Sequence, residues 1–80
     1  MHIEIHSKSD CPWCVKAKEW LTSKDHFYSE IIHDKVEERN DFYDKYKLVG
    51  SKRTMPKIFI IHENDEIYVG GYNQLETSGL

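Results

Sequence analysis

Between residues 8 and 14 the chain reads Lys-Ser-Asp-Cys-Pro-Trp-Cys, so that two residues separate two cysteines and a proline follows the first cysteine. Proline is favoured at the first position of an α-helix, where its missing N–H group is not needed. A helix should therefore begin at Pro12, with Cys11 as its N-cap, and run to about Lys24, since no glycine interrupts the segment. This places the cysteine pair at the N-terminus of a helix.

The segments on either side of this helix alternate between strand and helix patterns. Ile3 and Ile5 alternate with polar neighbours, which predicts a short strand before the cysteines. After the helix, the patterns predict a strand over 27–32. A helix should follow, opened by the capping-box-like pair Asp34 and Glu37 and ended near Gly50. The rest of the chain predicts a strand over 57–61, its hairpin partner over 66–69, and a last short helix opened by Asn73 and Glu76. The predicted order is βαβαββα.

This order predicts an α/β fold. A strand, a helix and a second strand form a parallel pair with a right-handed crossover, and the late hairpin adds antiparallel strands to the same sheet. We therefore expect a four-stranded mixed sheet flanked by helices. Eighty residues bury roughly 63% of the surface of the unfolded chain, which predicts a single domain over residues 1–80 without room for a large enclosed cofactor.

The charge balance and hydropathy pattern exclude several function classes. Eleven Lys and Arg against 14 Asp and Glu give a net charge of −3, which argues against a general nucleic-acid binder. No stretch approaches the roughly 18 apolar residues of a membrane span, and the first residues lack the pattern of a secretory signal. We expect a cytoplasmic protein without a membrane partner, and no surface pattern demands more than a monomer.

The position of the cysteines predicts redox chemistry. The sulfur of an N-cap cysteine faces unpaired backbone N–H groups and the positive end of the helix dipole, which favours the thiolate. The pKa of Cys11 should therefore be lowered, with Lys8 adding to this effect and Asp10 opposing it. Cys14 follows one helical turn later and is expected to be better covered, which makes it the natural resolving thiol.

Two other interpretations of the cysteine pair are weaker. A structural disulfide across so short a loop would contribute only about 2 kcal/mol in the chain-entropy model. A zinc site needs two further ligands at characteristic spacing, and the chain has no second pair of this kind. The histidines are interpreted as surface residues and no metal site is predicted; they are His2, His6, His26, His33 and His62. Phe42, Tyr43 and Tyr46 are interpreted as core and surface residues rather than a cofactor site.

Three motifs together resemble the dithiol glutaredoxins over nearly the whole chain. They are the cysteine motif of residues 8–14, Thr54-Met55-Pro56 before a strand, and Gly-Gly-Tyr-Asn-Gln-Leu over 70–75. The resemblance implies a thioredoxin-like fold and a glutathione-disulfide oxidoreductase with no tightly bound cofactor. It implies glutathione as co-substrate, and disulfide-containing or glutathionylated proteins as substrates.

The resemblance also implies roles for individual residues. Cys11 is similar to the family's nucleophile and Cys14 to its resolving cysteine, and Pro56 is similar to the family's cis-proline. The helix near Asn73 would offer N–H groups to the γ-glutamyl carboxylate, and the basic run over 47–57 would attract glutathione or form a solvated loop. The implied glutathione-binding residues are Lys8, Trp13, Thr54, Met55, Pro56, Gly71, Tyr72 and Asn73.

One departure from the family pattern leaves the reductant open. Family members often carry an acidic residue just after the paired glycines, whereas Asn73 and Gln74 are neutral, so that glutathione affinity is expected to fall unless Glu76 substitutes. An alternative is an electron donor reduced by thioredoxin reductase that serves, for example, ribonucleotide reductase. A third is an iron–sulfur or metal-binding module, which Pro12 disfavours by the same resemblance.

Overall fold

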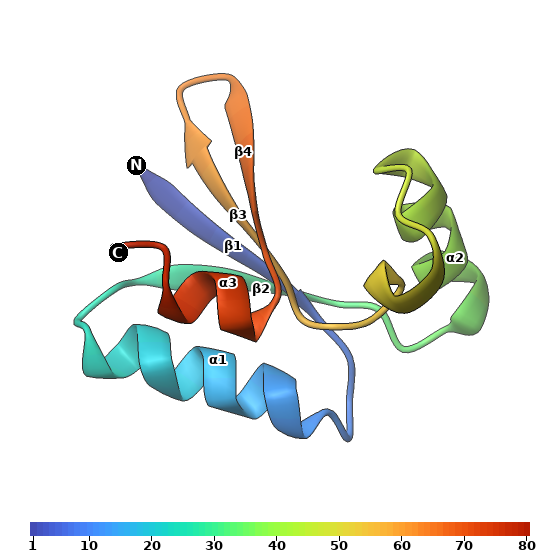
Figure 1. The fold of residues 1–80 in the computed structure, drawn as a ribbon, viewed down its shortest axis with the longest axis horizontal. Helices are drawn as coiled ribbons and strands as arrows, with labels where there is room; N and C mark the ends of the chain where they lie inside the picture. Colours follow the sequence, from blue (N-terminus) through green and yellow to red (C-terminus); the bar gives the residue numbers. More distant parts are fainter.

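The computed structural model describes all 80 residues and shows a four-stranded sheet with three α-helices (Figure 1). The predicted order βαβαββα is confirmed, with one additional 3₁₀ turn. The elements are β1 (His2–Ser7), α1 (Pro12–Ser23), β2 (Tyr28–Ile32), α2 (Val36–Lys45), the 3₁₀ turn η1 (Gly50–Lys52), β3 (Lys57–His62), β4 (Asp65–Gly70) and α3 (Tyr72–Glu76). None of the helices combines the length and the apolar character that a membrane crossing requires.

The sheet is mixed, as predicted, and its strand order is β2-β1-β3-β4. β1 pairs in parallel with β2, and α1 forms the crossover between them. β3 returns antiparallel to β1, and β4 forms a hairpin with β3. β1 is therefore a central strand, which explains why Ile3 and Ile5 are almost completely buried.

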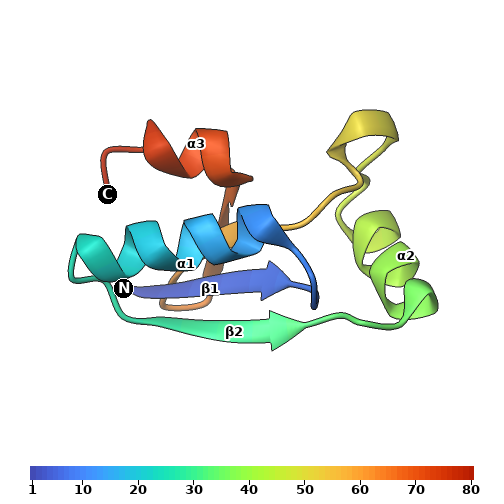
Figure 2. The same cartoon turned by 90° about the horizontal axis from the view of Figure 1, so that it is seen from below.

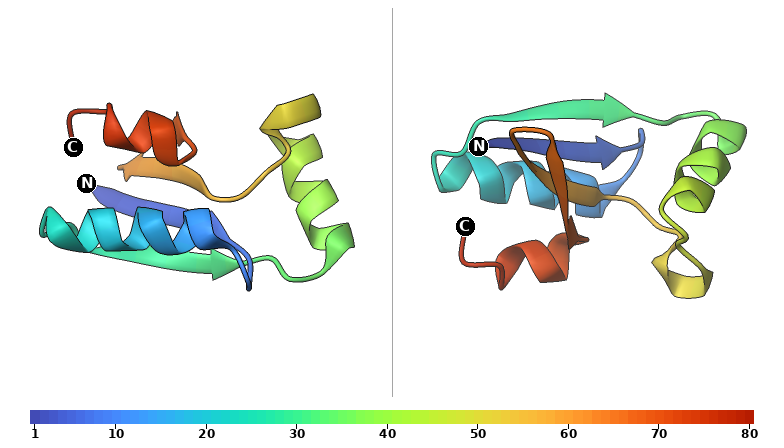
Figure 3. Two further views of the ribbon diagram at one scale, coloured as in Figure 1. Left: turned by 60° about the horizontal axis from the view of Figure 1, so that its bottom comes forward. Right: turned by 90° about the horizontal axis from the view of Figure 1, so that it is seen from above.

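One face of the sheet is covered by α1 and α3. In both views of Figure 3, α1 and α3 lie near each other, and α2 lies apart from them. Side chains with an exposed fraction of 2% or less form the core on this face: Ile3, Ile5, Ala17, Leu21, Ile58 and Leu75. We call this set the aliphatic cluster.

The opposite face packs against α2. Figure 2 shows α2 at the end of the sheet toward which the arrows of β1 and β2 point, away from both termini. Phe42 and Tyr43 of α2 are buried and Tyr46 is half-buried, so their predicted place in core and surface is confirmed. The buried members of this second core are Cys11, Cys14, Phe42, Tyr43, Leu48, Met55 and Phe59. We call this set the aromatic cluster.

The interpretation of all histidines as surface residues is wrong for His6, which is only 6% exposed. Its Nδ1 lies 2.8 Å from Nε2 of His33, and its Nε2 lies 2.8 Å from Oε1 of Glu4. Both imidazoles pack on Phe42, with ring centroids 4.5 and 5.0 Å away. The burial follows from the period of a strand, since His6 and Glu4 point to the face that α2 covers.

The predicted start and end of α2 need correction. Lys35, not Asp34, is the N-cap, and its side chain forms no capping bond. The carboxylate of Asp34 instead accepts hydrogen bonds from the N–H and the hydroxyl of Ser9, each at 2.7 Å. Asp34 therefore binds the loop before the cysteines rather than its own helix. The helix ends at Lys45, and Gly50 opens the 3₁₀ turn instead of stopping α2.

The predicted cap of the last helix is also wrong. α3 begins at Tyr72 with Gly71 as its N-cap, so Asn73 lies inside the helix. The N–H of Gly71 donates to Oε1 of Gln74 at 3.0 Å, which is the contact that closes this end of the helix. The paired glycines thus lead directly into α3, and Gln74 has a structural role that the sequence analysis did not assign.

Candidate active site

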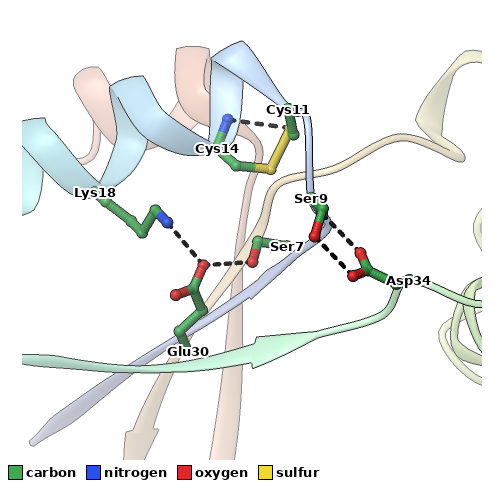
Figure 4. Close-up of polar contacts among 7 residues, drawn as sticks. All are labelled: Ser7, Ser9, Cys11, Cys14, Lys18, Glu30 and Asp34. Carbon is green, nitrogen blue, oxygen red and sulfur yellow. Dashed lines mark hydrogen bonds and ion pairs between the residues drawn. A yellow bond between two sulfur atoms is a disulfide. The ribbon is translucent and has the colours of Figure 1, made fainter.

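The cysteine pair lies at the N-terminus of α1, as predicted. Cys11 is the N-cap, and the N–H of Cys14 donates to its sulfur at 3.2 Å. The two sulfurs form a disulfide, with the Cα atoms 5.2 Å apart (Figure 4). Cys11 is 7% exposed and Cys14 is 1% exposed, which agrees with an attacking and a better covered resolving cysteine. The lowered pKa of Cys11 stays a prediction for the dithiol form, because a disulfide sulfur does not titrate.

Two carboxylates of the β2 side support the segment that leads to Cys11 (Figure 4). Asp34 binds Ser9 as described above, and these bonds lower the pKa of its carboxyl group. The hydroxyl of the buried Ser7 donates to Glu30 at 2.6 Å, and Lys18 of α1 pairs with the same carboxylate at 3.0 Å. The Ser7 hydrogen bond is the main cause of a lowered pKa at Glu30. The cysteine loop is therefore fixed to β2 and α1 by charge-assisted contacts.

The segment Thr54-Met55-Pro56 lies beside the disulfide. The peptide bond between Met55 and Pro56 is cis, which confirms the expectation from the family resemblance. The carbonyl oxygen of Met55 lies 3.6 Å from the sulfur of Cys11. Met55 is itself buried in the aromatic cluster, so this segment is held against the cysteines by packing as well as by the chain.

A groove of about 620 Å³ opens next to this segment. We call it the main groove. Seven of the eight predicted glutathione-binding residues line it: Trp13, Thr54, Met55, Pro56, Gly71, Tyr72 and Asn73. The rings of Trp13 and Tyr72 lie 5.6 Å apart, and Nζ of Lys16 lies 4.8 Å from the centre of the Trp13 ring. The structure thus brings three separate stretches of sequence together on one side of the disulfide.

Lys8, the eighth predicted residue, lines a second groove, which also contains Cys11. The two grooves share Trp13, Thr54 and Met55. Arg39 lines the second groove with Lys8 and was not predicted. Its guanidinium donates to backbone oxygens of residues 33 and 34 and forms no ion pair with a carboxylate. The sequence near the cysteines does not indicate Arg39, because this residue belongs to α2 and reaches the groove only in the folded chain.

The basic run over 47–57 does not form one solvated loop. Arg53 pairs with Asp44, whereas Lys57 is only 4% exposed and lines the main groove. Nζ of Lys57 donates to Thr54 Oγ1 at 3.3 Å and to the carbonyl of Pro56 at 3.5 Å, and burial lowers the pKa of the ammonium. The sequence could have indicated this burial, because Lys57 and Phe59 are two residues apart in β3 and alternate residues of a strand point to the same face.

Glu76 does not take the place of the missing acidic residue in the main groove. It is not a lining residue, and its carboxylate accepts a hydrogen bond from the hydroxyl of Tyr72 at 3.3 Å. No group of three or more His, Cys, Asp or Glu side chains is arranged to hold a metal ion.

Comparisons with known proteins agree with this geometry. The glutaredoxin family model matches residues 3–64. The chain is 38% identical over 74 residues to glutaredoxin 1 of Rickettsia felis, covering 91% of this chain and 67% of that protein. It is 31% identical over 75 residues to glutaredoxin 3 of Escherichia coli, covering 92% and 81% of the two chains. The chain thus spans about two thirds of the length of the Rickettsia relative.

A solved structure shows the same fold. Glutaredoxin 1 from Francisella tularensis, complexed with cacodylate, superposes with a TM-score of 0.80 at 31% identity, covering 96% of this chain and 90% of that chain. The fold is thus thioredoxin-like, as the sequence resemblance implied. With Cys11 and Cys14 as the redox-active pair of a thiol–disulfide oxidoreductase, the chain belongs to the glutaredoxin family.

Proposed function

We propose that the protein reduces protein disulfides and protein–glutathione mixed disulfides with glutathione as reductant. The observation that carries the proposal is the Cys11–Cys14 disulfide at the start of α1, directly beside two grooves that meet at Trp13, Thr54 and Met55. Cys11 itself lines the second groove, and the main groove begins at Trp13, Thr54 and Met55 next to it.

The reaction is thiol–disulfide exchange. The Cys11 thiolate attacks one sulfur of the substrate disulfide, a mixed disulfide forms, and the other sulfur leaves as a thiolate. Cys14 then attacks Cys11 and releases the second substrate sulfur, so that the protein dithiol loses two electrons and the substrate gains two. One glutathione opens the Cys11–Cys14 disulfide, and a second attacks the resulting mixed disulfide to give oxidised glutathione and the reduced protein.

The charges around the second groove support glutathione as the reductant. Lys8 and Arg39 line this groove, and neither forms an ion pair with a carboxylate of the protein. Glutathione carries two carboxylates, and an unpaired lysine and arginine are suitable partners for such groups. We propose that Lys8 and Arg39 bind a carboxylate of glutathione while its sulfur meets Cys11.

Substitution of each cysteine tests the assigned roles. We expect Cys11→Ser to abolish reduction of both disulfides and glutathionylated proteins, because no nucleophile remains. Cys14→Ser should keep reduction of glutathionylated proteins, since free glutathione resolves the mixed disulfide, but lose most reduction of protein disulfides. The measurement is NADPH consumption coupled to glutathione reductase with each substrate class. Equal losses for Cys14→Ser in both assays would contradict a resolving role.

A second candidate function follows from the neutral Asn73 and Gln74 in the main groove. In this alternative a thioredoxin reductase reduces the Cys11–Cys14 disulfide, and the protein donates electrons to an enzyme such as ribonucleotide reductase. The same NADPH assay separates the two when glutathione with glutathione reductase is compared with thioredoxin reductase alone. Activity only with thioredoxin reductase would replace glutathione as the reductant.

A further inference from the structure

The charged side chains that line the main groove are all positive. The groove is lined by 14 residues, of which Lys52 and Lys57 are the only charged ones, so the lining contains no carboxylate. The nearest acidic side chain along α3, Glu76, lies outside the lining and accepts the Tyr72 hydroxyl. A third cation, Lys16, stands over the Trp13 and Tyr72 rings at the rim. The groove is therefore purely cationic in a protein whose net charge is −3.

Lys57 is the most informative of these residues. Lys57 is only 4% exposed, and it forms no ion pair. Only two neutral oxygens, Thr54 Oγ1 and the Pro56 carbonyl, contact its ammonium, at 3.3 and 3.5 Å. A buried charge normally has a counter-ion, because its removal from water is costly. An anion bound in the groove would supply the counter-ion that the protein lacks.

The groove offers a bound ammonium no negative charge, because its other polar side chains, among them Ser51 and Asn73, are neutral. The side-chain oxygen of Gln74 already accepts the N–H of Gly71, which leaves its NH₂ donors for a ligand. Thr54 Oγ1 and the Pro56 carbonyl are occupied by Lys57. An α-ammonium that entered here would meet two lysines and no carboxylate, which is unfavourable by charge.

We propose that the main groove recognises low-molecular-weight thiols through a carboxylate of the ligand, which binds Lys57. An α-ammonium next to that carboxylate does not contribute to recognition. The substrate class then includes thiols and mixed disulfides that carry a carboxylate but no free amine. This inference rests on the proposed thiol–disulfide exchange at Cys11 and adds the ligand selectivity of the groove next to it.

The test compares two probes that differ only in the amine. One is a fluorogenic peptide in mixed disulfide with glutathione, and the other carries the glutaryl analogue, in which the amine of glutathione is replaced by hydrogen. Reduced protein is mixed with each probe in single-turnover stopped flow, and Cys11→Ser provides the blank. In this step Cys11 bonds to the ligand sulfur and the peptide leaves as its thiolate.

We expect the wild-type protein to react with the glutaryl probe at least as fast as with the glutathione probe. Lys57→Met should slow both probes by about tenfold or more, as expected when one charge-assisted contact is lost. Lys47→Met is the matched control, because Lys47 belongs to the same basic run but is exposed and lines neither groove. It should change neither rate.

Gln74→Glu adds the carboxylate that the groove lacks, and its oxygen can still accept the Gly71 N–H. It should shift the preference toward the glutathione probe by about threefold or more, the scale of an exposed ion pair. The wild-type ratio needs no variant, so a folding defect cannot hide the result.

The outcomes separate the two proposals. A glutathione probe that reacts tenfold faster than the glutaryl probe in the wild type would overturn the inference and leave the proposed function intact. Unchanged rates in a folded Lys57→Met variant would overturn the role of Lys57. A wild type that reacts with neither probe faster than Cys11→Ser would overturn the proposed function, and the inference with it.

Discussion

The two faces of the sheet are built from different chemistry. The aliphatic cluster under α1 and α3 consists of alkyl side chains, none of which titrates. The face under α2 combines the aromatic cluster with the chain Glu4, His6 and His33 and with the buried Lys57. The active-site cysteines, at the N-terminus of α1, and Met55 pack into the aromatic cluster. One side is thus entirely apolar, whereas the side that contacts the cysteines also contains buried polar and charged groups.

This difference indicates a division between stability and function. A cluster that contains only alkyl groups is stabilised by an amount that does not change with pH, because burial of apolar surface involves no proton. On the face under α2, by contrast, burial lowers the pKa of His33, so the stability that this face contributes depends on pH. The comparison can be tested on each face separately.

The largest expected effect is on the aliphatic face. Leu21 has an exposed fraction of 0%, so Leu21→Ala leaves a cavity that α1 and the sheet cannot close. We expect the free energy of unfolding to fall by about 2.7–5 kcal/mol, measured by urea unfolding of the oxidised protein. The loss should be the same at pH 7.5 and pH 5.5.

Val15→Ala on the same helix is the control, since Val15 is 48% exposed and its truncation should cost less than about 1 kcal/mol. Similar losses at the two positions would show that the aliphatic cluster is not the main source of stability.

The next largest expected effect concerns His33, on the face under α2. Burial, the neighbouring His6 and Arg39 lower the pKa of His33 in the folded protein, while Glu38 raises it. The unfolded chain therefore binds more protons in acid than the folded protein does, and stability falls as pH drops below the ordinary value of 6.5 toward the lowered pKa. Urea midpoints measured from pH 7.5 to pH 5 should decline across this window.

His33→Gln should flatten this decline, because the titrating group is gone. His62→Gln is the matched control at an exposed histidine and should leave the decline unchanged. A wild-type midpoint that stays constant from pH 7.5 to pH 5 would remove the proposed difference between the two faces.

The smallest expected effect concerns Glu30, at the edge of the aliphatic face. Glu30 accepts the Ser7 hydroxyl and pairs with Lys18, and these contacts lower its pKa from 4.5. The stability that they add is present above pH 4.5 and lost as pH falls toward the lowered value. Glu30→Gln should reduce the free energy of unfolding at pH 7 by roughly 1 kcal/mol, because solvent weakens the attraction within this partly exposed pair.

Glu63→Gln in the β3–β4 turn is the matched control and should change unfolding little, since Glu63 forms no ion pair. If the two variants behaved alike in urea unfolding at pH 7, the contact between β2 and α1 would have no energetic role.

Local sequence signals predicted much of the fold. The helix start at Pro12, the N-cap at Cys11 and the β3–β4 hairpin all depend on residues that are neighbours in the chain. The family resemblance added the cis bond at Met55–Pro56 and a set of groove residues of which seven lie together. Cap assignments for α2 and α3 were wrong because Asp34 and Gln74 found partners that competed with the predicted ones.

The order of the elements, the place of the dithiol and the motifs around it could thus be predicted from the sequence, since these follow from local preferences and spacing. Which charges are buried and which are paired could be seen only in the folded structure. His6 and His33 are 27 residues apart, and Ser9 and Asp34 are 25 apart. Lys57 of β3 lies opposite His6 of β1 and is buried without forming an ion pair. Burial and charge pairing depend on all surrounding elements at once, and no single segment of sequence contains that information.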